Sequence, residues 1–203
     1  MTEFFFATGN DYKIEEAKAA VLQFNIGITK FDTVKKLEIQ NLDLEEIANT
    51  AVSLIISQSK KPIFVEDSGL FIHHLNGFPG PYSSFVFETI GVDGILKLME
   101  EAKTRKAEFR SSVAFGMNGK WLATFSSATE GTIQLKPRGT NGFGFDPIFV
   151  PMWTSKTFSE MELKEKTVYS HRAKAISKLA LWFLNEATKK NPDLTETDSE
   201  GIS

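Results

Sequence analysis

Residues 64–85 read FVEDSGLFIHHLNGFPGPYSSF, an apolar strand followed by two carboxylates and then by a loop rich in glycine and proline. The pattern predicts that Glu66 and Asp67 lie at the exit of a strand. In α/β proteins, ligands bind beyond the carboxyl ends of the strands, where a carboxylate can meet a divalent cation. The stretch therefore indicates a catalytic corner, although Asp67 and Ser68 could equally begin a turn completed by Gly69.

The chain ahead of this stretch alternates strand and helix. Residues 4–7 predict a short buried strand, which breaks at a turn over 8–10. Apolar residues then recur at helical spacing over 14–21. A capping-box pattern at Asp43 opens a second predicted helix, which ends near Lys60. The first third of the chain thus has an α/β pattern.

The middle of the chain changes character. Two helices are expected over 85–90 and 95–99, separated at Gly91. Residues 107–133 then alternate apolar and polar side chains around an Asn-Gly pair at 118–119. Because Asn-Gly favours the tight turns that join antiparallel strands, this segment predicts a long β-hairpin.

The last part of the chain returns to a helical pattern over 170–187 and then becomes polar. At 203 residues the chain can bury a substantial core in one large domain or a two-lobed unit. We expect one two-lobed α/β domain over 1–190 and a polar, frayed tail over 191–203.

Composition excludes several classes of protein. A net charge of −3 leaves no excess of positive charge to follow a nucleic-acid backbone. The absence of cysteine excludes disulfides, a thiolate nucleophile and a cysteine-based zinc site. No stretch approaches the roughly 18 apolar residues of a membrane span, and the first residues lack a basic targeting region. We expect a cytoplasmic protein without a membrane or nucleic-acid partner.

The turn over 8–10 and the helix after it suggest a phosphate grip. It would be built from Thr8, Gly9, Asn10 and Lys13. Helix N-termini present unpaired N–H groups and a partial positive charge, and Lys13 lies one turn in, where it can reach a terminal phosphate. An ordinary capped helix with a surface lysine explains the pattern equally well. Asp11 and Tyr12 are expected to be solvated neighbours.

Glu38 is ordinarily interpreted as a surface residue. Together with Asp67 it becomes a candidate magnesium ligand, because Mg²⁺ on a nucleotide is commonly held by one or two carboxylates, phosphate oxygens and waters. His73 and His74 are adjacent and lack a spaced ligand partner, so we interpret them as strand or loop residues.

Residues 142–147, GFGFDP, place two aromatic rings between glycines. The glycines free the backbone to bring Phe143 against a flat ligand, and stacking a base on a ring contributes on the order of 1–3 kcal/mol. Both rings could instead belong to the core, and for Phe145 the core interpretation is favoured.

Two cations, a hydroxyl and an imidazole precede the last predicted helix. They belong to Lys166, Ser170, His171 and Arg172. Ser170 can cap the helix. If His171 and Arg172 direct donors at a ligand, they match the 6-oxo group of a purine and disfavour the 6-amino group of adenine. A site built to bond one group can reject an analogue that lacks it by up to ~10⁴–10⁵.

Five blocks of this sequence follow one another in a distinctive order. They are TGN-x-x-K-x-x-E at 8–16, VEDSGL at 65–70, GFPGPYSS at 77–84, GFGFDPIF at 142–149 and K-x-x-x-SHR at 166–172. In this order they resemble the inosine triphosphate pyrophosphatase family, and most of all its archaeal members. The resemblance implies a two-lobed fold with a long mixed twisted sheet, flanking helices and a central nucleotide-binding cleft. It also implies Mg²⁺-dependent hydrolysis of ITP, dITP and XTP to the monophosphate and pyrophosphate by a homodimer.

The resemblance also assigns roles. It makes Asp67 and Lys13 catalytic and gives Glu38 and Asp67 to the metal. The substrate would be bound by Thr8, Gly9, Asn10, Lys13, Ser68, Gly69, Phe143, Gly144, Phe145, Asp146, Lys166, Ser170, His171 and Arg172. Among these, Phe143 would stack on the base. The sequence departs from animal relatives at Ser84 and Ala51, where those enzymes carry lysines.

The hypothesis that follows is that water attacks the α-phosphorus, with Asp67 placing or deprotonating it and with charge neutralisation carrying the rate. Two alternatives stay open. One is a purine-nucleotide sensor without catalysis, against which the pair of Glu38 and Asp67 argues. The other is a metal-dependent phosphatase of other nucleotides, for which Phe143 would stack equally well.

Overall fold

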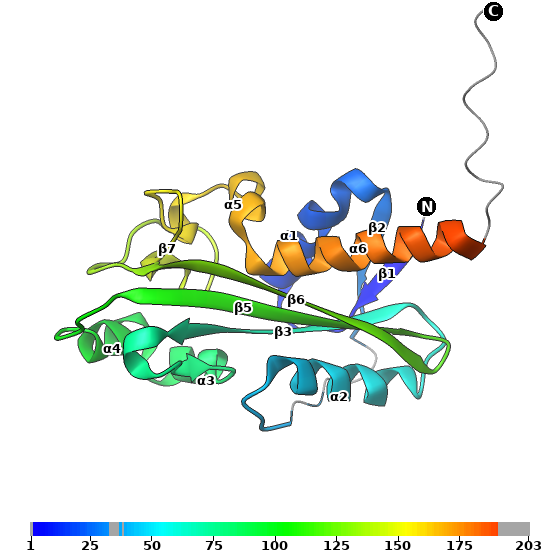
Figure 1. The fold of residues 1–203 in the computed structure, drawn as a ribbon, viewed down its shortest axis with the longest axis horizontal. Helices are drawn as coiled ribbons and strands as arrows, with labels where there is room; N and C mark the ends of the chain where they lie inside the picture. Colours follow the sequence, from blue (N-terminus) through cyan, green and yellow to red (C-terminus); the bar gives the residue numbers. More distant parts are fainter. Residues whose placement is uncertain (1, 33–36, 38, 191–203) are drawn as a thin grey trace, which may run out of the picture.

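The computed structural model describes residues 2–32, 37 and 39–190. One long mixed sheet runs through them, with helices on both faces (Figure 1). The strands are β1 (Thr2–Phe6), β2 (Ile26–Lys30), β3 (Ile63–Ile72), β4 (Pro79–Gly80), β5 (Lys106–Met117), β6 (Lys120–Ile133) and β7 (Phe149–Pro151). The helices are α1 (Asp11–Val21), α2 (Leu44–Ile56), α3 (Ser83–Thr89), α4 (Gly91–Leu98), α5 (Leu163–Tyr169) and α6 (His171–Lys190). The expected α/β class with a long mixed sheet and flanking helices is confirmed.

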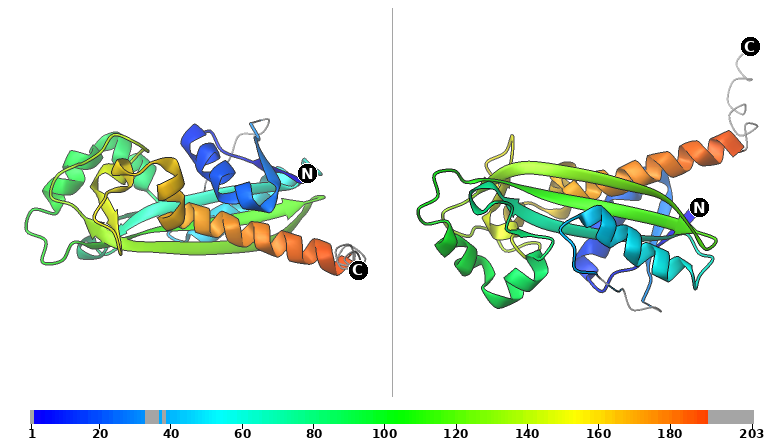
Figure 2. Two further views of the ribbon diagram at one scale, coloured as in Figure 1. Left: turned by 90° about the horizontal axis from the view of Figure 1, so that it is seen from above. Right: turned by 60° about the horizontal axis from the view of Figure 1, so that its bottom comes forward.

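The strand order is β2-β1-β3-β5-β6-β7, and β4 pairs with β3 beside this path. β1 runs parallel to β2 and β3, whereas the pairs from β3 to β7 are antiparallel. Helices α1 and α6 lie on one face, and α2, α3 and α4 lie on the other (Figures 1 and 2). Three apolar clusters fill the spaces between helices and sheet. Of the helices that the structure describes, none has both the length and the apolar run needed to cross a bilayer.

The β5–β6 hairpin is the longest feature of the sheet. Its turn is formed by Asn118 with φ 55° and Gly119 with φ 76°, the left-handed conformation that this pair tolerates. The predicted hairpin over 107–133 is therefore confirmed, with β5 starting one residue earlier. Because β5 is long, it pairs with its other neighbour in the sheet, β3, over ten consecutive residues.

β3 corrects the prediction about the two carboxylates. The strand continues to Ile72, so Glu66 and Asp67 lie inside it and not at its exit. Asp67 and Ser68 do not begin a turn with Gly69 either, since all three residues pair with β5. The glycine is needed for another reason: a Cβ on Gly69 would stand 2.0 Å from the carbonyl oxygen of Gly80, where β4 approaches β3.

The helix ends follow from local capping. The side chain of Asn10 accepts a hydrogen bond from Lys13 N–H and starts α1, directly after the predicted turn over 8–10. Asp43 starts α2, but it accepts from the N–H of Glu45. α2 ends at Ile56, before the predicted end near Lys60.

Candidate active site

The candidate site lies where β1 and β4 leave one edge of β3 uncovered. β1 pairs with β3 only up to Phe6, opposite Phe64, and β4 takes over at Leu70. Between them, no strand among the described residues pairs with this edge of residues 65–69. The turn over 8–10 follows β1 directly, so the predicted phosphate grip starts beside this open edge.

The phosphate-grip turn has the geometry of a capped helix. Thr8 Oγ1 accepts from Asn10 N–H at 3.2 Å, and Asn10 Oδ1 accepts from Lys13 N–H at 3.2 Å. A Cβ on Gly9 would meet no atom within 4 Å, so the turn is open on that side. The helix cap is confirmed, but Lys13 is not a surface lysine: its side chain is only 17% exposed and lies 2.8 Å from Glu66.

The two carboxylates of β3 point to opposite faces, because successive strand residues alternate. Glu66 faces α1 and α6: its carboxylate lies 2.8 Å from Lys13 Nζ and 3.1 Å from Arg172 Nε, and it accepts from Ser111 at 2.8 Å. Asp67 is opposite Ser112 on β5 and is 8% exposed. Residues directly opposite each other share a face, so Asp67 faces α2.

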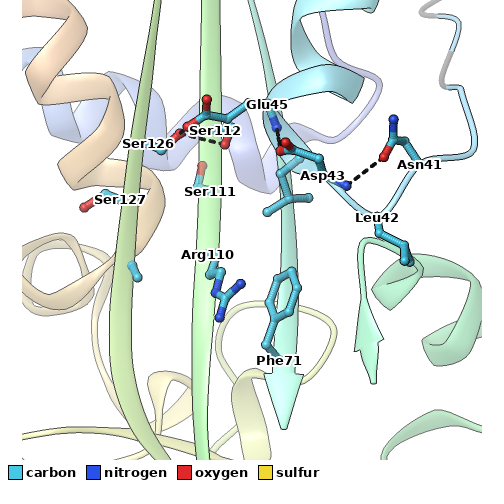
Figure 3. Close-up of a pocket in the computed structure, with 12 residues that line it drawn as sticks. Asn41, Leu42, Asp43, Glu45, Phe71, Arg110, Ser111, Ser112, Ser126 and Ser127 are labelled. Carbon is cyan, nitrogen blue, oxygen red and sulfur yellow. Dashed lines mark hydrogen bonds between the residues drawn. The ribbon is translucent and has the colours of Figure 1, made fainter. Parts of the chain in front are cut away.

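On the face of Asp67, a cavity of about 580 Å³ lies between the N-terminus of α2 and strands β3, β5 and β6 (Figure 3). Ser126 donates to Glu45 at 2.7 Å, and Ser112 and Ser126 are hydrogen-bonded at 2.8 Å. The lining is thus polar at Ser112, which is opposite Asp67 in the sheet, and at Ser126 and Glu45. Arg110 supplies a cation at the other end of this cavity.

The structure does not supply a complete metal cage from its described residues, among which no group of three or more histidine or acidic side chains converges. Glu38, the second predicted ligand, lies outside the described residues. Mg²⁺ on a nucleotide needs only one or two protein carboxylates, because phosphates and waters complete its shell. Asp67, a carboxylate beside a polar cavity, has the donor chemistry for that role.

On the other face, the predicted cations join a buried network that the sequence did not reveal. Arg172 Nη1 lies 2.7 Å from Glu16, and Lys166 Nζ contacts Glu16 and lies 2.7 Å from Asp146. With Lys13 and Glu66, the network contains three cations and three carboxylates. The positive charges predicted for a triphosphate are therefore already paired within the protein.

The remaining polar groups tie this network to the strands and helices. Arg172 Nη2 donates to Ser68 at 2.9 Å. Ser170 donates to Glu16, and it caps α6 by accepting from Ala173 N–H at 3.3 Å, as predicted. Lys166 comes from the short helix α5, which the sequence pattern did not predict.

Burial and charge shift the acidity of the network in both directions. Burial alone would raise the pKa of Glu16, but Arg172 and Lys166 hold it down at about 2. For Asp146 burial prevails, and its pKa is raised despite Lys166. Glu16 is therefore a firm anion, whereas Asp146 is the carboxylate of the network that takes up a proton more readily.

His171 is buried and neutral. Burial, with Arg172 beside it, lowers its pKa well below the ordinary value. Its ring stacks on Phe109 with centroids 4.8 Å apart, and neither ring nitrogen has a hydrogen-bond partner in the structure. Because buried polar groups are nearly always paired, this imidazole has one N–H donor and one acceptor available to a ligand.

The two aromatic rings of residues 142–147 lie in different environments, as the sequence indicated. Phe145 is buried and packs edge-on against Phe87, which confirms the core interpretation. Phe143 is half-buried, and its backbone N–H donates to Asp146 at 2.9 Å. Gly142 and Gly144 both have positive φ, and a Cβ on Gly142 would stand 2.2 Å from Asp146 Oδ2. The glycines thus let the loop close over the network.

The contacts connect most of the predicted site. Lys13 reaches Glu66, Glu66 reaches Arg172, and Arg172 lies 5.4 Å from the ring centroid of Phe143, with His171 next in sequence. Asp67 is adjacent in the strand but faces the other side of the sheet. Glu16 and Glu66 were given no role in binding or catalysis. The signal that could have identified them is a Glu on the apolar face of α1 and a Glu within an apolar strand.

Comparison with known proteins identifies the family. The family model described as Ham1 family matches residues 4–182. A protein from Methanopyrus kandleri named dITP/XTP pyrophosphatase is 46% identical over 180 residues, which cover 89% of this chain and 95% of that protein. One of the same name from Saccharolobus solfataricus is 46% identical over 183 residues, covering 90% and 94%.

Solved structures agree with these sequences. A HAM1 protein from Coxiella burnetii superposes with a TM-score of 0.77 at 28% identity, covering 91% of this chain and all of that one. A nucleoside-triphosphatase, dITP/XTP pyrophosphatase, from Mycobacterium abscessus gives a TM-score of 0.67 at 25% identity, covering 88% and 98%. The family model and these relatives match nearly the whole described length of the chain, including the buried charge network and the open strand edge beside it. The chain belongs to the Ham1 family.

Proposed function

We propose that this chain is a nucleoside triphosphate pyrophosphatase that hydrolyses ITP, dITP and XTP to the monophosphate and pyrophosphate. The observation that carries the proposal is His171, a buried, neutral imidazole whose ring nitrogens have no partner in the structure. It is next in sequence to Arg172, whose guanidinium lies 5.4 Å from the Phe143 ring centroid. The relatives named dITP/XTP pyrophosphatase, at 40–46% identity, support the same substrates.

His171 accounts for the choice of base. Its N–H can donate to the 6-oxo group shared by hypoxanthine and xanthine, while the 6-amino group of adenine is itself a donor. The proposal places the proton on the ring nitrogen that faces the base, because in the other tautomer that nitrogen would accept from the 6-amino group of adenine. An unpaired buried donor makes binding of adenine costly, which gives the site its discrimination.

The phosphates are assigned to the open edge of β3. Lys13 and the N-terminal N–H groups of α1 attract the phosphate oxygens. Asp67 orients a water against the α-phosphorus and takes its proton. The bond from that phosphorus to the bridging oxygen breaks, and pyrophosphate leaves. Mg²⁺, held by Asp67 and by Glu38, would neutralise charge on the phosphate oxygens.

Assembly and compartment belong to the same proposal. We expect a homodimer, as the resemblance implies, and a cytoplasmic enzyme that acts on small-molecule substrates.

The proposal predicts product and selectivity together. With Mg²⁺ present, ITP and XTP at equal concentration should release pyrophosphate at least 100-fold faster than ATP, because adenine leaves the His171 donor unpaired. Pyrophosphate and orthophosphate are measured separately for ITP, XTP, GTP, ATP and dTTP, with a chelated sample as the blank. Nucleotide bound but intact would indicate a sensor, and equal rates for ATP and dTTP would indicate a general phosphatase.

A further inference from the structure

Tyr12, an exposed residue, makes a specific aromatic contact with the candidate site. Its ring lies against Phe143, with centroids 5.6 Å apart and an angle of 22° between the planes. The sequence interpretation as a solvated neighbour is half right, since Tyr12 is 58% exposed. One side of the phenol faces water and the other faces the ring proposed to carry the base.

Phe143 has few other supports. Its flanking residues Gly142 and Gly144 carry no side chain, and both have positive φ. Two buried cations, Lys166 Nζ and Arg172 Cζ, lie 5.3 and 5.4 Å from its ring centroid. These cations are fixed by carboxylates, whereas Tyr12 contacts the ring by stacking alone. The orientation of the Phe143 ring therefore depends on the phenol.

Tyr12 also joins two parts of the site. It precedes Lys13 in the first turn of α1, where Asn10 caps the helix. Lys13 Nζ lies 2.8 Å from the Glu66 carboxylate, while the Tyr12 ring stacks on Phe143. One rigid helical turn thus holds the cation for the phosphates and the support for the base ring, and it fixes the distance between the two.

We propose that Tyr12 is a positioning residue that stacks on Phe143 and holds that ring as the platform for the purine. The inference rests on the proposed function, in which Phe143 stacks on the base. Offset or parallel aromatic pairs contribute about 0.5–1.5 kcal/mol beyond the area they bury, which corresponds to roughly 2- to 12-fold in affinity.

The test distinguishes an effect on binding of the base from an effect on binding of the phosphates. Tyr12→Ala should raise KM for ITP roughly 3- to 10-fold with kcat within about 2-fold, because the chemistry at the α-phosphorus is untouched. Tyr12→Phe should restore the wild-type KM, since only the ring is needed. Inorganic tripolyphosphate, which has no base, should inhibit Tyr12→Ala and wild type with the same inhibition constant. Trp121→Ala, an exposed aromatic residue on β6, is the matched control.

A double-mutant cycle decides whether Tyr12 acts through Phe143. In the Phe143→Ala background, Tyr12→Ala should add little to KM, because the ring that it supports is gone. Additive losses, or an equal loss of tripolyphosphate inhibition, would overturn the inference, as would a Tyr12→Ala enzyme identical to wild type. If the wild type releases no pyrophosphate from ITP, the proposed function and this inference both fail; if it does, the inference stands or falls by itself.

Discussion

Asp67→Asn should reduce pyrophosphate release from ITP by about 10²–10⁴-fold, the range typical for loss of a positioned general base. The substitution keeps the size of the side chain and removes the charge that accepts the proton from water. Asp67 is mostly buried inside β3, paired along its length with β5, so the isosteric change leaves the strand in place. Turnover should therefore fall much further than nucleotide binding.

The measurement compares kcat with the dissociation constant of ITP from equilibrium dialysis. Asp93→Asn, the same chemical change in the first turn of α4, is the control and should keep full activity. A near-normal kcat for Asp67→Asn would remove Asp67 from the catalytic role, whatever its effect on binding.

Glu16→Gln should lower the free energy of unfolding by about 3–5 kcal/mol. Glu16 compensates two buried cations, Arg172 and Lys166, and removing one partner of a buried ion pair leaves uncompensated charge in the interior. The control is the neighbouring residue: Glu15→Gln breaks an exposed pair with Lys18 and should cost less than about 1 kcal/mol. Urea unfolding of both variants measures the difference.

The same variant should change the response to acid. The pKa of Glu16 is about 2 in the folded protein against an ordinary value of 4.5. Its stabilisation, about 3 kcal/mol, is fully present above pH 4.5 and is lost as the pH falls towards 2. Asp146, whose pKa is raised, acts in the opposite sense, so the informative quantity is the difference between wild type and Glu16→Gln. A difference that stays constant from pH 6 to pH 3 would contradict the assignment.

Local signals predicted much of the fold. The Asn-Gly pair at 118–119 located the long hairpin, and the turn over 8–10 and Asp43 located the starts of α1 and α2. Each of these features is decided by residues within a few positions, through a turn geometry or a cap. The helices around Gly91 were found in the same way.

Features decided by distant partners were not predictable. Ser68 and Gly69 look like a turn locally, but pairing with β5, more than forty residues away, keeps them in the strand. The role of Glu16 depends on Lys166 and Arg172, about 150 residues further on. The contact between Tyr12 and Phe143 likewise exists only after folding.

The most direct test of the central claim is hydrolysis of ITP in water enriched in ¹⁸O. The products are separated, and their masses are measured by mass spectrometry. The account predicts inosine monophosphate carrying one ¹⁸O and unlabelled pyrophosphate, because water attacks the α-phosphorus. Label in the pyrophosphate, or orthophosphate as the first product, would place the attack at another phosphorus and contradict the account.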